Sequence, residues 1–298
     1  MVRTLIDHGA DIDISADEDG PTPAFNAARD DRLDILKILI ACGADLKRRL
    51  PFMWETILHR TAETDNVQAA KMLLQSGADV NATDKILRTP LHEAKSKAMA
   101  QLLLDHGAKI DALKVDLGQP IHSAAWAVAT EVVRYLISRG AGVDARDWDG
   151  RTPLHYVAES ADDSETTNLL IESGADIEAQ TYTHASEYPG VTPLHCAVLH
   201  LNFITLQTLI AAGANVNSED AEGETPLDFI EGNVLYGDVP HDSYVSSQNI
   251  IEALRSAGGK TTASPNRERK TTYFAPQLER VPSAYDETNE NPKARRTR

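Results

Sequence analysis

The sequence repeats itself at a nearly constant interval, and no other feature constrains its fold as strongly. A Gly-Ala pair occurs seven times and a Gly-Gly pair follows, at steps of 34, 34, 30, 33, 34, 39 and 45 residues. The glycines that begin these pairs are Gly9, Gly43, Gly77, Gly107, Gly140, Gly174, Gly213 and Gly258. A second motif, TPLH, stands at 89–92, 152–155 and 192–195 and keeps phase with the first. Two motifs in phase predict a stack of similar units.

One unit can be interpreted from its clearest copy. Thr152 is a good helix cap and Pro153 suits the first helical position, so a first helix begins there. A polar stretch interrupts the pattern, and the apolar run at 169–171 predicts a second helix. Gly174 ends it, because glycine readily adopts the left-handed conformation of a helix terminus. The polar turn at 147–150 projects between one helix pair and the next.

These motifs, D-x-x-G-x-T-P-L-H-x-A and L-L-x-x-G-A-D-x-N, resemble the ankyrin repeat. The resemblance implies an all-α solenoid of stacked helix-turn-helix units with protruding turns, in which each unit contacts its neighbours. It covers residues 1–259: a half repeat at 1–12, six full repeats over 13–216, and a degenerate C-terminal repeat at 217–259. The half repeat indicates either a truncated chain or an exposed start.

Three departures from the pattern predict irregular stacking. The third copy is short between its helices, at 93–101, and the turn before Thr192 carries an insertion at 181–190. The last copy expands at 232–244, which predicts a long loop between its helices. Residues 260–298 are rich in Pro, Ser, Thr and charge, so we expect a disordered tail.

The charge is unevenly distributed. The chain carries −16 in total, but residues 260–298 hold nine Lys/Arg against five Asp/Glu, a balance of +4 that leaves −20 for the rest. An acidic body repels phosphates, so it disfavours direct binding of nucleic acid or an anionic membrane. We therefore expect a protein partner with a basic or a mixed basic and apolar surface. No apolar run reaches the length of a membrane span.

The compartment is predicted to be intracellular, cytoplasmic or nuclear. No N-terminal stretch has the pattern of a secretion signal, and the two cysteines, Cys42 and Cys196, form neither a disulfide framework nor a zinc motif. The tail's basic clusters, at 267–270 and 293–298, are candidate nuclear import signals, although simple solvation explains such runs more often.

Residues that resemble catalytic groups are better explained by the repeat. His59, His92, His122, His155 and His195 all take the fourth place of the TPLH motif or its variants. The resemblance implies that they bond backbone and hold neighbouring units together. In the pair His195-Cys196, successive helix residues point in different directions, which disfavours a nucleophile and its base. Leu254 replaces a required glycine in a partial phosphate-loop match. We expect no enzyme activity, metal or cofactor.

The ankyrin resemblance implies that partners bind the turn tips and the exposed face of the first helices. Candidate binding residues at those positions are Asp19, Arg29, Asp30, Glu63, Trp126, Trp148, Asp149, Arg151, Glu159, Leu199, His200, Glu222 and Glu224. Trp126 and Trp148 are predicted to form an aromatic centre with an acidic rim, since aromatic residues often dominate interfaces. It is equally consistent with the sequence that the Trp148 side chain folds onto a neighbouring unit instead. The turn at 48–55 is either an apolar contact or a tucked-in loop.

The favoured function is a non-catalytic scaffold or adaptor that binds a partner protein through its concave and turn-tip face. One alternative is a nuclear transcriptional co-regulator that acts through protein binding. Only the basic tail favours this alternative. Another is a repeat fragment of a larger enzyme, suggested by the half repeat at 1–12. Fold does not identify a partner.

Overall fold

A computed structural model describes residues 1–15, 20–50, 52–182, 189–236 and 244–262. In these ranges the regular elements are helices, apart from one isolated antiparallel bridge between Arg49 and Thr56. No helix in the described part is both long and apolar enough to cross a membrane. The predicted binding residue Asp19, most of the predicted insertion and nearly all of the predicted tail lie outside the described residues.

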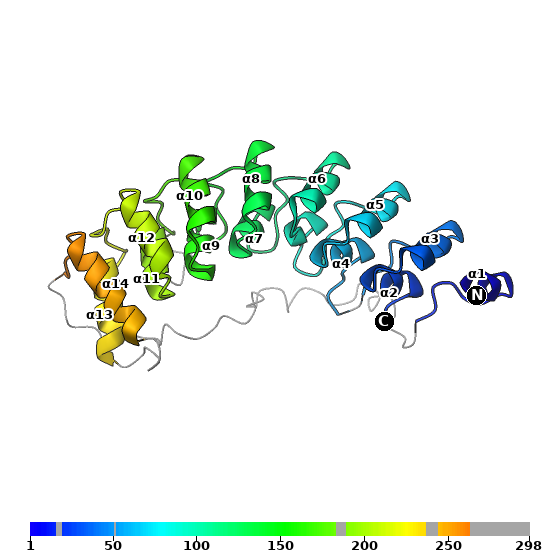
Figure 1. The fold of residues 1–298 in the computed structure, drawn as a ribbon, viewed down its shortest axis with the longest axis horizontal. Helices are drawn as coiled ribbons and strands as arrows, with labels where there is room; N and C mark the ends of the chain where they lie inside the picture. The colour runs from blue at the N-terminus through cyan, green and yellow to red at the C-terminus, as the bar shows by residue number, and fades with distance from the viewer. Residues whose placement is uncertain (16–19, 51, 183–188, 237–243, 263–298) are drawn as a thin grey trace, which may run out of the picture.

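The helices form two rows along an arc, as Figure 1 shows. The inner row holds the first helix of each unit: α2 (Pro23–Arg29), α4 (Ile57–Glu63), the 3-10 turn η1 (Pro90–Glu93), α7 (Pro120–Trp126), α9 (Pro153–Ser160), α11 (Pro193–Leu199) and α13 (Pro226–Tyr236). The outer row holds α1 (Val2–Asp7), α3 (Leu33–Ala41), α5 (Val67–Gln75), α6 (Lys97–Asp105), α8 (Thr130–Ser138), α10 (Ser164–Glu172), α12 (Phe203–Ala211) and α14 (Tyr244–Ser256).

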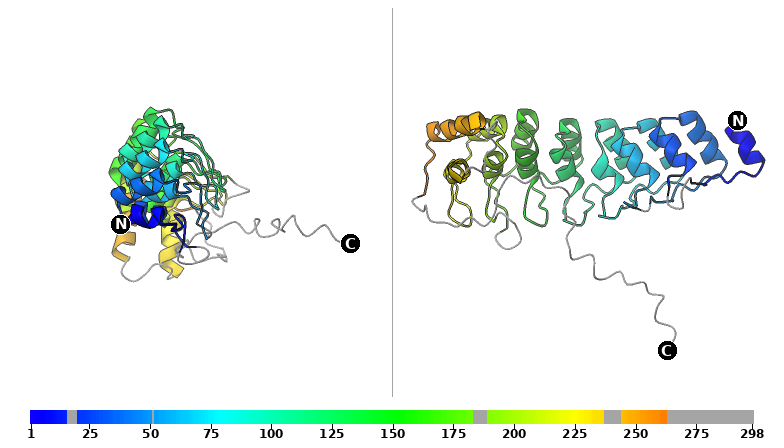
Figure 2. Two further views of the ribbon diagram at one scale, coloured as in Figure 1. Left: turned by 90° about the vertical axis from the view of Figure 1, so that its right-hand side faces the viewer. Right: turned by 90° about the horizontal axis from the view of Figure 1, so that it is seen from below.

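Each helix contacts its successor in the same row, and the two helices of a unit contact each other. The turns between units project from one side of the stack (Figure 2). We call them fingers 2 to 7, for the turns that precede α4, η1, α7, α9, α11 and α13. The inner row and the fingers together line the concave face of the arc. This arrangement confirms the predicted all-α solenoid of helix pairs.

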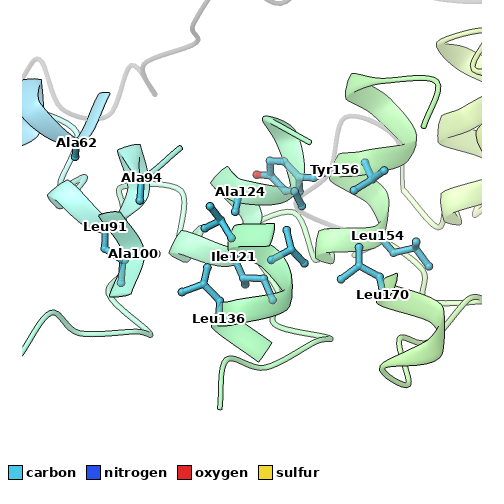
Figure 3. Packing of buried hydrophobic residues seen from close by; sticks show 14 of the residues in the cluster. Ala62, Leu91, Ala94, Ala100, Ile121, Ala124, Leu136, Leu154, Tyr156 and Leu170 are labelled. Atoms are coloured by element: carbon cyan, nitrogen blue, oxygen red, sulfur yellow. The ribbon is translucent and has the colours of Figure 1, made fainter. Parts of the chain in front are cut away.

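The core is a continuous column of buried side chains between the two rows (Figure 3). The third residue of the TPLH-type motif is at most 3% exposed in six units: Leu58, Leu91, Ile121, Leu154, Leu194 and Leu227. Repetition of one buried position in every unit makes each unit's core depend on its neighbours.

The Gly-Ala motif ends the second helix as expected. Gly174 has a φ of +91°, in the left-handed region that side chains disfavour. Its N–H donates to the carbonyl of Ile171 (2.9 Å), and the N–H of Ala175 donates to that of Leu170 (3.0 Å). Both bonds satisfy carbonyls that the helix end would otherwise leave unpaired.

Two of the predicted irregularities take a different form from the one expected. The short third unit keeps its second helix but reduces its first to the 3-10 turn η1, because its chain leaves helical geometry at Ala94. In the last unit α13 continues to Tyr236 and α14 begins at Tyr244. The predicted loop at 232–244 was therefore too long, and its central residues lie outside the described part.

Candidate interaction surface

The TPLH histidines are structural, as predicted. In α9 the N–H of Thr152 donates to His155 Nδ1 (3.1 Å), so Nε2 carries the proton and donates to the carbonyl of Val191 in the next unit (3.2 Å). Equivalent bonds join the other four histidines to the next unit. Burial lowers the pKa of His155 to about 3 and those of His92 and His195 to about 4, which keeps these rings neutral.

The remaining reactive group in this motif is not poised for chemistry. Cys196 is buried beside His195, and burial is the main cause that raises the pKa of its thiol, which disfavours the nucleophilic thiolate. Across the described residues no group of three or more His, Cys, Asp or Glu side chains is arranged to hold a metal ion.

The centre of the concave face is a pair of aromatic rings on neighbouring inner helices. Trp126, at the end of α7, is 50% exposed, and its ring meets that of Tyr156 in α9 edge to face, with centroids 6.2 Å apart. The Tyr156 hydroxyl donates to the Asp147 carboxylate (2.8 Å), which fixes the ring. The Lys114 ammonium lies 6.0 Å from the Tyr156 centroid and pairs with Asp116 at 2.7 Å. Trp126 thus presents a large apolar surface on a rigid support.

Behind this centre lies an ion pair. Arg151 Nη1 lies 3.2 Å from Glu159 Oε2, and the two side chains are only 12% and 11% exposed. Burial raises the pKa of Glu159, and Arg151 opposes that rise. Burial is also the largest single influence on Arg151 and lowers its pKa, but Glu159, Asp147 and other neighbouring groups together outweigh it and hold the pKa above the ordinary value. His200 Nε2 lies 3.9 Å from the same carboxylate. These side chains face each other more than they face solvent.

A second ion-pair network covers the inner face of the second and third units. Arg88 pairs with Asp84 and Glu93, each at 2.7 Å. Arg60 pairs with Glu55 at 3.0 Å and also with Glu63. Most carboxylates of the inner helices are therefore matched by an arginine. The inner face of these units therefore carries paired charges of both signs.

The predicted binding residues differ in their exposure and in their position on the molecule. Leu199 is only 6% exposed and belongs to the core, so its assignment to the exposed face is wrong. The helix that carries it, α11, packs between α9 and α13, and α13 is longer than the other inner helices. Arg29 and Asp30 are exposed and pair with each other at 2.8 Å. Glu222 is exposed and Glu224 half-buried, both on finger 7, far along the chain from the aromatic centre.

Trp148 does not fold into the stack. Its side chain is 60% exposed. Its backbone N–H donates to the backbone carbonyl of Asp116 in the preceding finger (2.7 Å). Asp149 beside it is half-buried, and its carbonyl accepts from the Tyr182 N–H (2.8 Å). Of the two alternatives for Trp148, the structure has the exposed tip.

Sequence reasoning missed Tyr156, Lys114 and the two arginines Arg60 and Arg88. Tyr156 is the one aromatic residue directly after a TPLH histidine, which was a usable signal. No comparable signal marks Arg88, because its partners Glu55 and Asp84 come from two different units.

Comparison with protein families agrees with this geometry. Models described as "Ankyrin repeats (3 copies)" match residues 53–114 and 113–181, one described as "Ankyrin repeats (many copies)" matches 1–40, and one described as "Ankyrin repeat" matches 190–221. The human ASB11 ankyrin repeat domain has a similar structure, with a TM-score of 0.66 and 28% identity, over 81% of this chain and 100% of that one. The ankyrin repeat domain of Bcl-3 gives a TM-score of 0.58 at 26% identity, over 80% of this chain and 100% of that one.

The curated relatives are much longer proteins. "Putative palmitoyltransferase ZDHHC13" of Danio rerio is 29% identical over 77% of this chain, and the match spans 30% of its own length. Human neurogenic locus notch homolog protein 1 is 31% identical over 65% of this chain and 6% of its own. The fold and surface define a helical repeat solenoid with a concave face. The chain belongs to the ankyrin-repeat family.

Proposed function

We propose that this protein is a non-catalytic scaffold or adaptor that binds a partner protein through its concave face. The observation that carries the proposal is Trp126, half exposed at the middle of the inner row and held by Tyr156. An aromatic side chain on a rigid support loses little conformational entropy on binding, so it is a suitable interface anchor. Ankyrin-repeat domains in general are interaction modules, which supports the same conclusion.

The partner segment that suits this surface has an apolar side chain for Trp126 and basic groups beside it. Two of the paired carboxylates stay partly exposed, Glu63 at 39% and Glu93 at 20%, and the body of the protein is acidic overall. An incoming Lys or Arg therefore joins an existing network without leaving a buried charge unpaired. We propose no direct contact with nucleic acid or membrane.

The experiment is affinity capture from cell extract with the intact protein and with Trp126→Ala, followed by titration calorimetry on each purified partner. Ile204→Ala is the control, because Ile204 is a 46% exposed apolar residue on the outer row. We expect at least a tenfold loss of affinity for Trp126→Ala, which corresponds to about 1.4 kcal/mol, and none for Ile204→Ala. Equal affinity for all three proteins would place the partner elsewhere.

Two other functions keep a specific motivation. The possibility of a nuclear co-regulator that acts through protein binding is supported by the basic clusters at 267–270 and 293–298. Comparing the localisation of the full chain with that of a chain lacking 263–298 tests it.

The possibility of a repeat region within a larger enzyme is supported by the similarity to ZDHHC13, of which the chain matches 30%. An open reading frame that continues beyond this sequence would favour that possibility. An intracellular location is part of the main proposal.

A further inference from the structure

The last described residues are fixed at the inner row, at the C-terminal end of the concave face. After α14 the chain returns to the first turn of α13, where Asp228 takes the place of the TPLH histidine. The Asp228 carboxylate accepts from the Thr262 N–H (3.0 Å) and from the Thr262 hydroxyl (3.1 Å). The Lys260 N–H donates to the Asn217 side-chain oxygen (2.7 Å). The chain therefore leaves the stack at Thr262, and residues 263–298 continue from there.

The surface around Thr262 is acidic. The stretch 217–231, which includes finger 7 and the first part of α13, has six carboxylates and no Lys, Arg or His. Glu222 is exposed, whereas Glu231 pairs with Arg255 of α14 at 2.6 Å. Carboxylates outnumber cations here even with Arg255 and Lys260 counted. An incoming basic segment therefore meets attractive charge next to the point where the chain leaves the stack.

The residues that follow Thr262 have the complementary chemistry. The cluster at 267–270 has three cations and one carboxylate, and Tyr273 and Phe274 come directly after it in the sequence RERKTTYF. We call residues 267–274 the basic-aromatic segment. Basic groups beside an apolar side chain are also the features proposed above for a partner of the concave face.

Chain length limits which part of the concave face this segment reaches. An extended chain spans about 3.3 Å per residue, so residue 270 stays within about 26 Å of Thr262 and Phe274 within about 40 Å. The inner helices α13, α11, α9 and α7 contact each other in turn. Neighbouring helices lie about 10 Å apart, which places Trp126 of α7 about 30 Å from Thr262, within reach of Phe274.

The same limit excludes the acidic turn before α2. That turn, with Asp11 and Asp13, lies three inner elements beyond α7, at about 60 Å from Thr262 by the same spacing. The basic cluster at 267–270 therefore cannot reach it. The tether, and not charge alone, selects finger 7 as the acidic surface for this cluster.

We propose that the basic-aromatic segment binds the concave face of its own chain, with the cluster at 267–270 against finger 7 and with Tyr273 and Phe274 against Trp126. The Trp126 ring is 50% exposed and is supported by Tyr156, so it offers an aromatic surface for a second pair of rings. A tethered segment has an effective concentration of about 1 mM, so a weak contact is sufficient to occupy the face.

This inference rests on the proposed function, because it gives the same face an occupant from within the chain. A partner protein must then displace the segment before it contacts Trp126. A second copy of the chain and an outside partner are the other occupants to be distinguished.

The experiment is paramagnetic relaxation enhancement on the full-length chain, measured at its three tryptophan indole N–H groups. A nitroxide is attached at Ala275→Cys, next to Phe274, in a chain that also has Cys42→Ser. Cys196 is retained because it is buried. The same chain without Ala275→Cys, treated with the reagent, shows whether Cys196 is labelled. Single Trp→Phe variants assign the three signals.

We expect the nitroxide to remove more than half of the Trp126 signal and to leave the signal of Trp54, on finger 2, unchanged. Tyr273→Ser with Phe274→Ser should restore the Trp126 signal, because the aromatic contact is lost.

Charge reversal tests the contact with finger 7. The reversed cluster is Arg267→Glu, Arg269→Glu and Lys270→Glu, and it should also restore the Trp126 signal. The matched control makes the same change of charge further along the same tail: Lys293→Glu, Arg295→Glu and Arg296→Glu. We expect this control to keep the loss of the Trp126 signal.

Several outcomes would overturn the proposal. They are an unchanged Trp126 signal, equal losses at Trp54 and Trp126, a stronger loss at Trp148 than at Trp126, or a loss that the control removes as fully as the reversed cluster. A further one is the same loss when nitroxide-labelled chains are mixed with isotope-labelled chains that lack the nitroxide, since a second copy then occupies the face. Partner capture by Trp126→Ala is measured separately, so failure of this inference and failure of the proposed function are distinguishable.

Discussion

Arg151 and Glu159 form an ion pair at 3.2 Å although they lie at opposite ends of one unit's first helix, Arg151 just before its cap and Glu159 in its last turn. Both side chains are nearly nine-tenths buried, so each depends on the other for charge compensation.

Removing one member of this pair should therefore destabilise the protein more than removing both. We expect Arg151→Met to lower the free energy of unfolding by about 3 kcal/mol, because it leaves Glu159 buried without its counter-ion. Adding Glu159→Leu should recover more than half of that loss. Urea unfolding of the two single variants and the double variant measures the coupling, and strictly additive losses would contradict it.

The TPLH histidines predict an acid-sensitive fold. Burial lowers the pKa of His92, His155 and His195, so the unfolded chain binds more protons than the folded one below the ordinary histidine value of about 6.5. Stability from these rings is complete above that pH and is lost as the pH falls from about 6.5 towards 4. Each ring contributes a slope of about 1 kcal/mol per pH unit within that window.

Urea titrations at pH 7.5 and pH 5.5 test this slope. The His155→Asn variant should be less stable at pH 7.5 and should show a smaller difference between the two pH values, because one buried proton-binding group is gone. Glu93 and Glu159 have raised pKa values, and their effect has the opposite sign, since they favour folding while protonated. A stability that rises on acidification to pH 5.5 would refute the assignment to histidine.

The positions that sequence reasoning located correctly are those that every unit repeats. The histidine, the helix-ending glycine and the buried leucine each have one physical task that depends on the unit alone, so their periodicity was sufficient. The exposed surface was harder. Trp126, Glu159 and Leu199 all stand seven places after the helix cap, yet the first is 50% exposed and the last 6%.

Neighbouring units explain that difference. Trp126 ends α7, which packs between η1 and α9, whereas Leu199 ends α11, which packs between α9 and the longer α13. The same position therefore has different neighbours in different units. A pattern within one unit does not contain that information, and the ion pair of Arg88 with Glu55 joins two units in the same way.

Alanine substitution of two finger glycines distinguishes the cost of backbone strain from the cost of steric crowding. Gly150 and Gly223 have nearly equal positive φ, +79° and +78°. A Cβ on Gly150 would lie 2.8 Å from Tyr182 Cγ and 2.9 Å from its backbone nitrogen, whereas a Cβ on Gly223 meets nothing within 4 Å. Gly223→Ala should lose about 1 kcal/mol of unfolding free energy from the φ angle, and Gly150→Ala about 1 kcal/mol more from the contact.

Thermal unfolding of the two alanine variants side by side measures the difference. Equal losses would show that the Tyr182 backbone moves aside without cost. A larger loss for Gly150→Ala would show that the link between fingers 5 and 6, from Tyr182 to Asp149, is rigid enough to transmit a local clash.

Leu117 offers a test of backbone strain at a single exposed side chain. Leu117→Gly relieves a φ of +61° and removes an apolar group that is 39% exposed. Leu113→Gly removes a 48% exposed leucine from the same finger, and Leu113 itself has no positive φ. We expect the first variant to be more stable than the second by about 1 kcal/mol in urea unfolding, because glycine has no penalty in the left-handed region. If Leu117→Gly were the less stable variant, the Leu117 side chain would be contributing packing energy that outweighs its backbone strain.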